Sequence, residues 1–555
     1  MDATVNLLLP LLISHCLAAH QDVEHPDVVV VCHADFLPAL EPWLDHRRDQ
    51  GHRIAWIRNE GSAEAIRSRL APFARGGHLT HVVLVGAAPP LGEPGGADPR
   101  SLPVHYRRAQ VNVLWGSEPY IATDHGYADL TGDGVPDVAV GRFPAASPEA
   151  LEAFVAKTLA YESSGDFGPW RRRVNVVATS GEFGRIIDSL IETAARTILT
   201  RHVPADYAVS VAYGNWRSPF CPDPRRFHAA TLAQLNEGSL FWIYMGHGLP
   251  SSLDRLRVGD AAYHVFDASD VRRLAVQSGH PVALLLACYA GALDAADPCL
   301  AASMLEAPGG PVAVLAGSRV TMPYGMAVMG VELAEQHFRR QPLTLGETLL
   351  AAKRSMLADD PCAAGIRRVL DALANTLSPV PHLVPAERTE HVLLFNLFGD
   401  PLLRLPRAEV IEVDPLSPLA GEALRVTGYS PVAGEALVEL VVRRDRFVQP
   451  PPSRREPPAG AAEMAEMDGI FARSNDRRLA WTAVPIGAGP FAVALDVPRT
   501  ARGAAHVRVF VRGTEGHAMG SAAAIVRRPP QRPADAAGED RSDAVADHAE
   551  TGSDP

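Results

Sequence analysis

Two unbroken apolar runs of strand length constrain the fold of this chain more than any other feature. The first is SLFWIYMGHG, which ends at Gly248, and the second is PVALLLACYAG, which ends at Gly291. Runs that are apolar on both faces are typical of central strands in a parallel sheet. In open α/β sheets, the groups that do chemistry gather beyond the carboxyl ends of the strands. Neighbouring parallel strands would therefore bring His247 and Cys288 to one rim, as a base and a nucleophile.

The composition excludes several classes of protein. The chain has 555 residues, 47% of them hydrophobic, which is long enough for several domains with sizeable cores. Its net charge of -12 argues against a nucleic-acid-binding protein, which usually carries a basic surface. The three consecutive arginines, Arg171, Arg172 and Arg173, are expected on a solvated edge. Six scattered cysteines without a CxxC pair predict neither a disulfide framework nor a zinc site. No stretch after the N-terminus is typical of a transmembrane helix, so no integral membrane segment is expected.

Residues 1–26 are interpreted as a leader. They contain an apolar stretch of signal-peptide length followed by small residues, but Asp2 stands where a positive segment is usual. A leader predicts a secreted or cell-envelope protein, and a cytoplasmic protein is the alternative.

Strands alternate with helices over residues 27–406, which indicates a parallel sheet with helices on its faces. The pattern suggests two α/β subdomains, at 27–173 and 174–406. Ser147 is expected to cap one of the helices, and Thr344 and Glu347 form a capping box at the start of another.

Three further segments differ from this α/β pattern in composition. Residues 87–119 are rich in Pro and Gly and are expected to form a long surface connection without regular elements. Short β-branched runs between Pro and Gly predict an immunoglobulin-like β-sandwich at 407–528. Residues 529–555 are dominated by Ala, Asp, Arg, Glu and Pro and are expected to be a disordered tail.

An acidic segment precedes the strand DVAVG. Its aspartates could hold a hard cation such as calcium through oxygen ligands, although their spacing is not that of an EF-hand. The alternative is an Asp/Gly turn, because both residue types favour turns for backbone reasons alone. The candidate ligands are Asp124, Asp129, Asp133 and Asp137.

The surroundings of His247 and Cys288 favour a catalytic role over that of an inert cysteine and an ordinary loop histidine. Gly246 and Gly248 flank His247, so the backbone can bend sharply and approach a substrate closely. An isolated cysteine is most often a buried, inert thiol. A strand terminus that faces an imidazole instead provides the electropositive, partly exposed setting that a thiolate needs.

These residues resemble the gingipain family of cysteine peptidases, in the caspase-like clan. The resemblance rests on the apolar block before Gly246, His247 and Gly248, and on the apolar block before Ala287 and Cys288. It continues through PCLAASMLEAPGGPVAVLAGSR, with DVAVGRFP upstream and NLFGDPLL near the end of the catalytic region. It extends over residues 27 to about 406.

The resemblance implies a cysteine endopeptidase that hydrolyses polypeptides through an acyl-enzyme and requires no cofactor, so that calcium would be structural. It implies a caspase-like catalytic region of two α/β subdomains followed by an immunoglobulin-like domain. Cys288 matches the nucleophile and His247 the general base and acid. The backbone N–H groups of Gly248 and Cys288 match the oxyanion hole. Glu182 matches the acidic residue that orients the histidine, and an ordinary loop glutamate is the alternative.

The resemblance also bears on the residue before the scissile bond, P1. Asp188 lies near the position where arginine-specific members carry the acidic residue of the specificity pocket, which implies Arg or Lys at P1. Alternatively, Asp188 only favours a helix N-terminus through the dipole. Ser318 and Arg319 follow the strand PVAVLAG on the same rim, and Arg319 could instead receive an acidic P1 residue.

Two other functions fit the same sequence. One is a catalytically idle scaffold or binding protein, which retention of both His247 and Cys288 disfavours. The other is a sortase-like transpeptidase, in which an amine rather than water resolves the acyl-enzyme. Product analysis separates transfer from hydrolysis.

Overall fold

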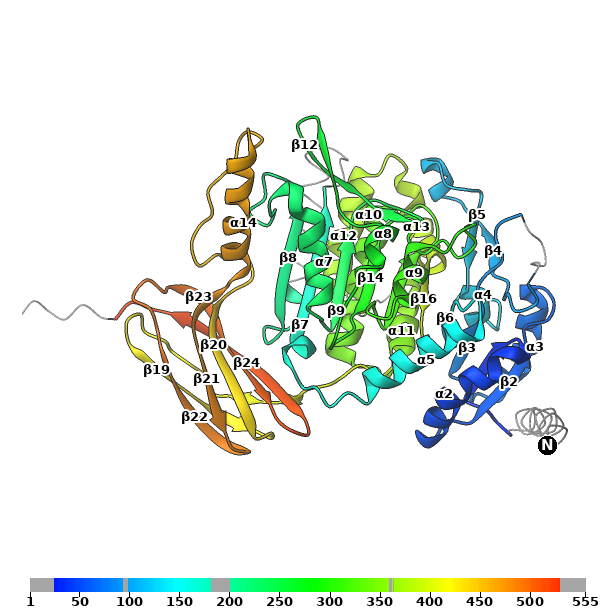
Figure 1. The fold of residues 1–555 in the computed structure, drawn as a ribbon, viewed down its shortest axis with the longest axis horizontal. Coiled ribbons are helices and arrows are strands. Elements are labelled where there is room, and N and C mark those ends of the chain that lie inside the picture. The colour runs from blue at the N-terminus through cyan, green and yellow to red at the C-terminus, as the bar shows by residue number, and fades with distance from the viewer. Residues whose placement is uncertain (1–23, 93–97, 181–199, 359–361, 363, 530–555) are drawn as a thin grey trace, which may run out of the picture.

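The computed structural model describes residues 24–92, 98–180, 200–358, 362 and 364–529 (Figure 1). The fold is built around one sheet of ten strands in the order β2-β1-β3-β6-β16-β15-β14-β9-β7-β8. In chain order these are β1 (Val28–Cys32), β2 (Ile54–Arg58), β3 (His81–Val85), β6 (Ala139–Phe143), β7 (Arg173–Thr179), β8 (Ala208–Gly214), β9 (Phe241–Met245), β14 (Val282–Leu286), β15 (Ala313–Gly317) and β16 (Phe395–Phe398).

The sheet consists of two parallel halves that run in opposite directions. β16 pairs parallel with β6 but antiparallel with β15, and the described neighbours within each half are parallel. The strands from both expected α/β subdomains therefore join in one continuous sheet. The carboxyl ends of β15, β14, β9, β7 and β8 share one rim, and those of the other half lie at the opposite rim.

Helices cover both faces of this sheet. The helices of this region are α2 (Leu37–Asp49), α3 (Ala63–Arg75), α4 (His125–Ala128), α5 (Pro148–Glu162), α7 (Phe227–Asn236), α8 (Ala268–Val271), α9 (Leu300–Glu306), α10 (Pro323–Glu335), α11 (Leu345–Leu357), α12 (Ala364–Leu377) and α13 (Val384–Leu394). Helix α12 packs on α10 and α13. Ala283 and Leu285 of β14 pack in one core, and Leu284 and Leu286 pack in another core with α10 and α11. This two-sided burial is what the unbroken apolar runs predict.

Two helices begin at the capping residues that the sequence predicts. The Ser147 side chain accepts a hydrogen bond from the Ala150 amide at the start of α5. Thr344 and Glu347 form the expected capping box of α11. Among the helices of the described ranges, none is long and apolar enough to cross a membrane.

One buried cluster holds helices α2 and α5 to the end of the catalytic region. Asp400, in the NLFGDPLL segment, accepts hydrogen bonds from Arg47 Nη2 at 2.6 Å and from Trp43 Nε1 at 2.5 Å. Arg47 also pairs with Glu162 at 2.8 Å. The Asp400 carboxylate is fully buried, so this motif has a structural role.

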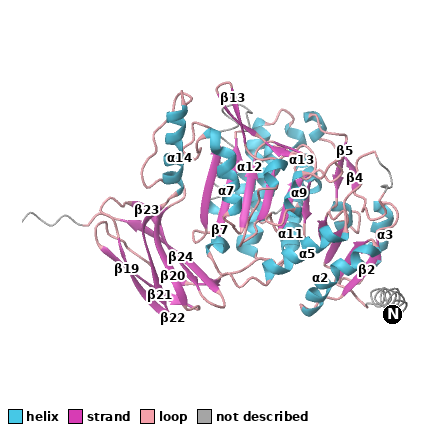
Figure 2. Cartoon of the chain, in the orientation of Figure 1, coloured by secondary structure: helices cyan, strands magenta, loops and turns pink. Residues whose placement is uncertain are grey.

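Residues 409–526 form two further sheets around a shared core (Figure 2). The five-stranded sheet has the order β17-β24-β23-β20-β21, and the three-stranded sheet β18-β19-β22. Their strands are β17 (Glu409–Val410), β18 (Glu412–Val413), β19 (Ala423–Ser430), β20 (Gly434–Val442), β21 (Arg478–Ile486), β22 (Gly489–Asp496), β23 (Gly503–Arg512) and β24 (His517–Val526). The strand pattern does not predict α14 (Ala461–Asn475), which is inserted between β20 and β21.

Helix α14 lies beside the edge strand β8 (Figure 1). Asn475, its last residue, accepts a hydrogen bond from the Val211 amide at 2.8 Å and donates one to the Val211 carbonyl at 3.0 Å. An amide side chain can satisfy both groups of an exposed strand edge, which would otherwise be open to pairing with another chain.

The expectation that Arg171, Arg172 and Arg173 lie on a solvated edge is wrong for the first two. Arg171 and Arg172 are buried. Arg172 pairs with Glu439 of β20 at 2.8 Å, and Arg508 of β23 pairs with the same carboxylate at 2.6 Å. Two guanidinium groups around one buried carboxylate connect the large sheet to the C-terminal sheets.

The expectation of a surface connection without elements at 87–119 also needs correction. β4 (His105–Arg108) lies within it and pairs antiparallel with β5 (Tyr120–Thr123). A short 3-10 helix, η2 (Asn112–Trp115), lies between these strands. Two small hairpins follow β9, formed by β10 (Gly248–Leu249) with β11 (Ser252–Leu253) and by β12 (Arg255–Val258) with β13 (Ala261–His264).

Candidate active site

His247 and Cys288 follow two neighbouring strands at the same rim of the sheet. β9 and β14 are parallel and in register, with Met245 opposite Leu286. His247 comes two residues after β9, and Cys288 comes two residues after β14. The prediction that the two apolar runs are adjacent parallel strands is confirmed.

The backbones of Gly248 and Cys288 are in close contact. A Cβ atom on Gly248 would lie 2.6 Å from the Cys288 carbonyl oxygen and 2.9 Å from the Ala287 Cβ, so only glycine fits. Gly248 is opposite Leu253 in the β10–β11 hairpin, but the Leu253 amide donates to Phe266 instead, at 2.8 Å. In an antiparallel ladder such a pair is not hydrogen-bonded, so the Gly248 N–H points away from β11.

The hydroxyl of Tyr244 contacts the backbone of His247. This hydroxyl donates to the His247 carbonyl at 2.8 Å, accepts from the Asp254 amide at 3.3 Å, and lies 3.2 Å from Thr179 Oγ1. Tyr244 is fully buried, and burial raises its pKa, so the phenol stays protonated as a donor. The sequence marks Tyr244 only as part of an apolar strand, which hides this role.

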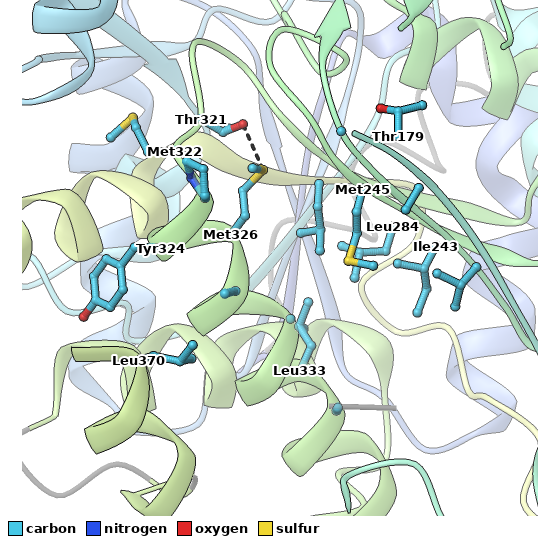
Figure 3. Close-up of a pocket in the computed structure, with 18 of the residues that line it drawn as sticks. Thr179, Ile243, Met245, Leu284, Thr321, Met322, Tyr324, Met326, Leu333 and Leu370 are labelled. Atoms are coloured by element: carbon cyan, nitrogen blue, oxygen red, sulfur yellow. Dashed lines mark hydrogen bonds between the residues drawn. The ribbon is translucent and has the colours of Figure 1, made fainter. Parts of the chain in front are cut away.

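The sulfur of Cys288 contacts the segment that follows β15. The Thr321 amide donates to Cys288 Sγ at 3.3 Å, and Thr321 Oγ1 donates to Met326 Sδ at 3.2 Å (Figure 3). Hydrogen bonds to charged acceptors are stronger than those to neutral ones, so this amide is placed to stabilise the thiolate form of Cys288. Sequence reasoning missed Thr321, although its place just after a strand of the same rim is a usable signal.

Tyr289, directly after Cys288, has a left-handed backbone with φ of 57°. This conformation costs a non-glycine residue about 1 kcal/mol or more and persists only where the surroundings impose it. The Tyr289 amide donates to the Arg319 carbonyl at 3.2 Å, and its hydroxyl donates to Glu118 Oε2 at 2.8 Å. These two contacts hold the turn that directs the backbone around Cys288.

Ser318 and Arg319 lie on the predicted rim but point into the protein. Ser318 is buried, and its hydroxyl donates to the Ala122 carbonyl at 2.6 Å. Arg319 makes two hydrogen bonds to Asp294, at 2.8 Å and 2.6 Å, and both side chains are at most 3% exposed. Burial opposes its charge, but the bonds to Asp294 prevail and raise the pKa of Arg319. Its charge is therefore already neutralised.

Glu182 and Asp188 lie outside the described residues. β7 ends at Thr179 and is the other neighbour of β9, with Ala178 opposite Met245. β7 thus ends at the rim that carries His247.

The acidic segment makes backbone contacts typical of turns. Asp129 accepts from the amides of Gly132 and Gly134 at 2.7 Å and 3.1 Å, and Asp137 accepts from that of Leu130 at 2.8 Å. Asp133 accepts from the Val135 amide at 2.8 Å. Asp124 is instead buried in a pair with Arg142 at 2.6 Å. The structure does not bring the four carboxylates together as one group of ligands.

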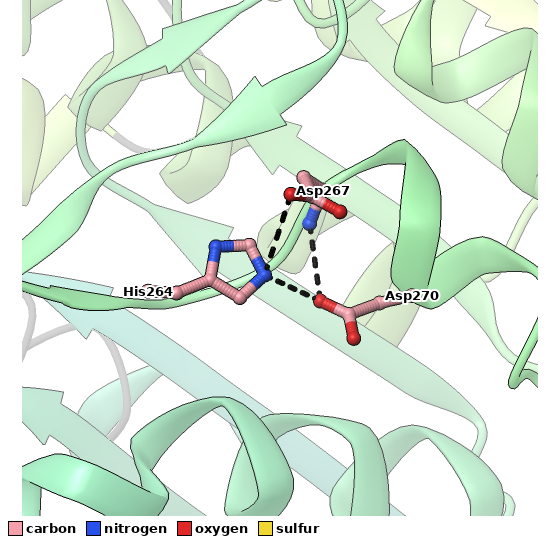
Figure 4. Close-up of side chains that lie close together, drawn as sticks. All are labelled: His264, Asp267 and Asp270. Carbon is pink, nitrogen blue, oxygen red and sulfur yellow. Dashed lines mark hydrogen bonds and ion pairs between the residues drawn. The ribbon is translucent and has the colours of Figure 1, made fainter.

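In the described parts of the chain, one group of three side chains has the spacing of a metal site (Figure 4). His264 Nε2 lies 2.6 Å from Asp270 Oδ2 and 3.7 Å from Asp267 Oδ2. Each acid also has a local partner, because Asp267 caps α8 and Asp270 pairs with Arg273 at 2.9 Å. The contacts join β13 to α8, which is sufficient to explain the cluster.

A cavity of about 760 Å³ includes His247, Cys288 and Thr321 in its lining. The lining is mostly apolar, with Ile243, Met245, Leu284 and Met326 among the residues drawn (Figure 3). The described residues therefore bring a thiol, an imidazole and backbone amides into the lining of one cavity. Such a combination suits nucleophilic attack on a carbonyl group.

The family comparison agrees with this chemistry, and the comparisons with solved structures concern the fold. The sequence model of peptidase family C25 matches residues 21–406. The fold is similar to that of the Arg-specific cysteine proteinase gingipain R (RgpB), with a TM-score of 0.51 and 16% identity over 92% of this chain and 99% of that chain. A structure described only as a protease has a TM-score of 0.50 and 14% identity over 92% of this chain and 99% of that chain. The complex of the Porphyromonas gingivalis RgpB pro- and mature domains gives a TM-score of 0.49 and 15% identity over 90% of this chain and 100% of that chain. The search of curated proteins gives no match.

Proposed function

Because the chain belongs to peptidase family C25 and is a cysteine endopeptidase, we propose that Cys288 is its nucleophile and His247 its general base and acid. The observation that carries this assignment is the pairing of β9 with β14, which ends both strands at one rim. The remaining described cysteines are less suited, since Cys32, Cys221 and Cys299 are buried and Cys362 lies far along the chain in an exposed turn.

The reaction follows from the groups at the rim. The Cys288 sulfur attacks the peptide carbonyl carbon while His247 takes the thiol proton, and the C=O bond becomes a C–O⁻ single bond. The amides of Gly248 and Cys288 receive the oxyanion, and the direction of the Gly248 N–H away from β11 supports this role. The C–N bond then breaks, His247 returns the proton to the leaving amine, and water hydrolyses the thioester to free acid and thiol.

Glu182 orients His247 in this proposal, and Asp188 receives a basic P1 residue. Support for Glu182 comes from the position of β7, which ends beside β9. Arg319 is a weaker candidate for the P1 pocket because Asp294 already pairs with its guanidinium. Profiling with a peptide library distinguishes the two: cleavage after Arg or Lys that Asp188→Ala abolishes supports Asp188, and cleavage after Asp or Glu that Arg319→Ala abolishes contradicts it.

The proposed domain layout keeps the boundaries that the sequence suggests, with α/β subdomains at 27–173 and 174–406 and an immunoglobulin-like sandwich at 407–528. The leader expected at 1–26 and the tail expected at 529–555 lie almost entirely outside the described residues. The shared core of the two C-terminal sheets supports the sandwich. The leader pattern supports a secreted or cell-envelope location. Calcium in the acidic segment would be structural.

Two substitutions test the assignment of the dyad. Cys288→Ala and His247→Ala should each remove hydrolysis of a denatured protein substrate while leaving the thermal unfolding temperature close to that of the parent. Cys362→Ala is the matched control, because it removes an exposed thiol that does not follow a strand of the sheet. Activity that survives Cys288→Ala, or is lost equally in Cys362→Ala, contradicts the proposal. Mass analysis of products with an added amine separates hydrolysis from transpeptidation.

A further inference from the structure

Large apolar side chains are exposed on the segment that joins β4 to β5. Residues 109–119 make up this segment, the 109–119 loop. Trp115 in this loop is 52% exposed, and Leu114 beside it and Tyr120 just after it are also exposed. Exposed groups of large apolar side chains on a soluble protein often mark an interaction site.

The exposure is not the result of a loosely held loop. The Ala109 amide donates to the Pro119 carbonyl at 2.9 Å and closes the loop at its base. Three successive amides, of Gln110, Val111 and Asn112, donate to the buried Glu390 carboxylate, the last two at 2.8 Å and 3.0 Å. A carboxylate that accepts several amide hydrogen bonds is a strong anchor, so Trp115 is presented from a fixed backbone.

The same loop is tied to the residue after the nucleophile. Glu118 accepts the hydrogen bond from the Tyr289 hydroxyl at 2.8 Å and lies 3.4 Å from Arg319 Nε. Because Tyr289 follows Cys288 directly, the loop contacts the turn that carries the reacting sulfur.

Trp115 lines the cavity that contains His247 and Cys288. So does Leu249, which follows Gly248 in the β10–β11 hairpin and is 58% exposed. Trp115 and Leu249 thus come from separate segments that both line this cavity, and Leu249 directly follows Gly248, whose backbone packs against that of Cys288. Side chains next to a peptide bond placed at Cys288 would therefore meet this lining.

We propose that Trp115, with Leu249, forms a subsite that binds an apolar side chain of the polypeptide substrate close to the scissile bond. The subsite rests on the proposed function of Cys288 and adds to it a preference for peptides with an apolar residue at one position beside the cleaved bond. The indole face supplies a large contact area with little loss of side-chain freedom, and its burial by an apolar side chain favours the complex.

The test uses pairs of peptides that differ only by Leu or Ser at one position on either side of the cleaved bond. At one position, Trp115→Ala should lower kcat/KM for the Leu peptide about tenfold and for the Ser peptide less than about twofold. Trp115→Phe should retain most of the preference, since it keeps an aromatic face. Trp481→Ala is the matched control, because Trp481 is 56% exposed on β21 in the C-terminal sheets.

An unchanged Leu-to-Ser ratio in Trp115→Ala at every position overturns the subsite, and so does an equal loss for both peptides. A second measurement separates this result from failure of the nucleophile assignment. Binding of the same peptide pairs to Cys288→Ala should show the Leu preference, and adding Trp115→Ala should remove it. If Cys288→Ala still hydrolyses peptides, the assignment of Cys288 as the nucleophile is wrong. The ratio of Leu-peptide to Ser-peptide binding then tests the subsite by itself.

Discussion

The hydroxyl of Tyr244 donates a hydrogen bond to the backbone carbonyl of His247 at 2.8 Å. The same oxygen accepts the Asp254 amide at 3.3 Å and lies 3.2 Å from Thr179 Oγ1. One buried phenol thus connects the ends of β7 and β9 with the segment that follows β11. Its position makes Tyr244 a positioning residue for the proposed general base.

Tyr244→Phe keeps the ring and removes only these hydrogen bonds. We expect kcat to fall about tenfold, because displacing the base weakens proton transfer, with about 1 kcal/mol lost from the free energy of unfolding. Tyr127→Phe is the control, since the Tyr127 hydroxyl donates to the Pro103 carbonyl at 2.7 Å, outside the site. The pH profile of kcat/KM should change only in Tyr244→Phe. Equal effects of the two variants would show that Tyr244 is merely structural.

Cys288 should be the most reactive thiol. Burial raises the pKa of Cys32 and Cys221 to about 12 and that of Cys299 to about 11, so these thiols stay protonated. Brief labelling with substoichiometric iodoacetamide and peptide mapping should find the adduct on Cys288 before the exposed Cys362. His247→Ala should slow labelling of Cys288 and leave that of Cys362 unchanged. Preferential labelling of Cys299 or Cys362 would refute the assignment.

Asp400→Asn should destabilise the fold without touching the reacting groups. It removes one of the two carboxylates that pair with the buried Arg47 and leaves Glu162 as the other, and losing a buried charge-assisted hydrogen bond costs about 1.5–3 kcal/mol. Urea denaturation measures the loss. Asp476→Asn, which breaks the exposed pair with Arg478 at 2.8 Å, should cost less than about 1 kcal/mol. Similar losses in the two variants would contradict the structural role given to Asp400.

Glu387 should make stability depend on pH. Burial, reinforced by the charge of Glu390, raises the pKa of Glu387 from 4.5 to about 7. The folded protein therefore holds a proton that the unfolded chain releases, and the stability present below pH 4.5 is lost as the pH rises through about 7.

Glu387→Gln carries no such proton, so its free energy of unfolding relative to the parent should rise between about pH 5 and pH 8, by at most about 3 kcal/mol. Urea denaturation at both pH values measures the change. The exposed Glu152→Gln should show no comparable trend. A difference between Glu387→Gln and the parent that is the same at both pH values would contradict the burial effect.

The acidic segment should not respond to calcium. Backbone amides already occupy the carboxylates of Asp129, Asp133 and Asp137, and Arg142 occupies that of Asp124. We expect the same Tm with added calcium and with a chelator. A Tm that rises with calcium concentration, as mass action requires of a bound ion, would instead establish a cation site.

The sequence by itself determined the arrangement of the central strands. Unbroken apolar runs must be buried on both faces, which makes them inner strands, and parallel strands end at one rim, which brings His247 and Cys288 together. The capping roles of Ser147 and Thr344 were also predictable from the sequence, because a cap depends on residues within one helical turn.

Only the tertiary structure decided the contacts between distant segments. The burial of Arg172 depends on Glu439, and the conformation of Tyr289 depends on Glu118 and the Arg319 carbonyl. The antiparallel junction of β16 with β15, which reverses half of the sheet, likewise has no local signal. Local patterns record which faces a segment must bury, whereas charge pairs and strained backbones depend on partners that folding brings from elsewhere in the chain.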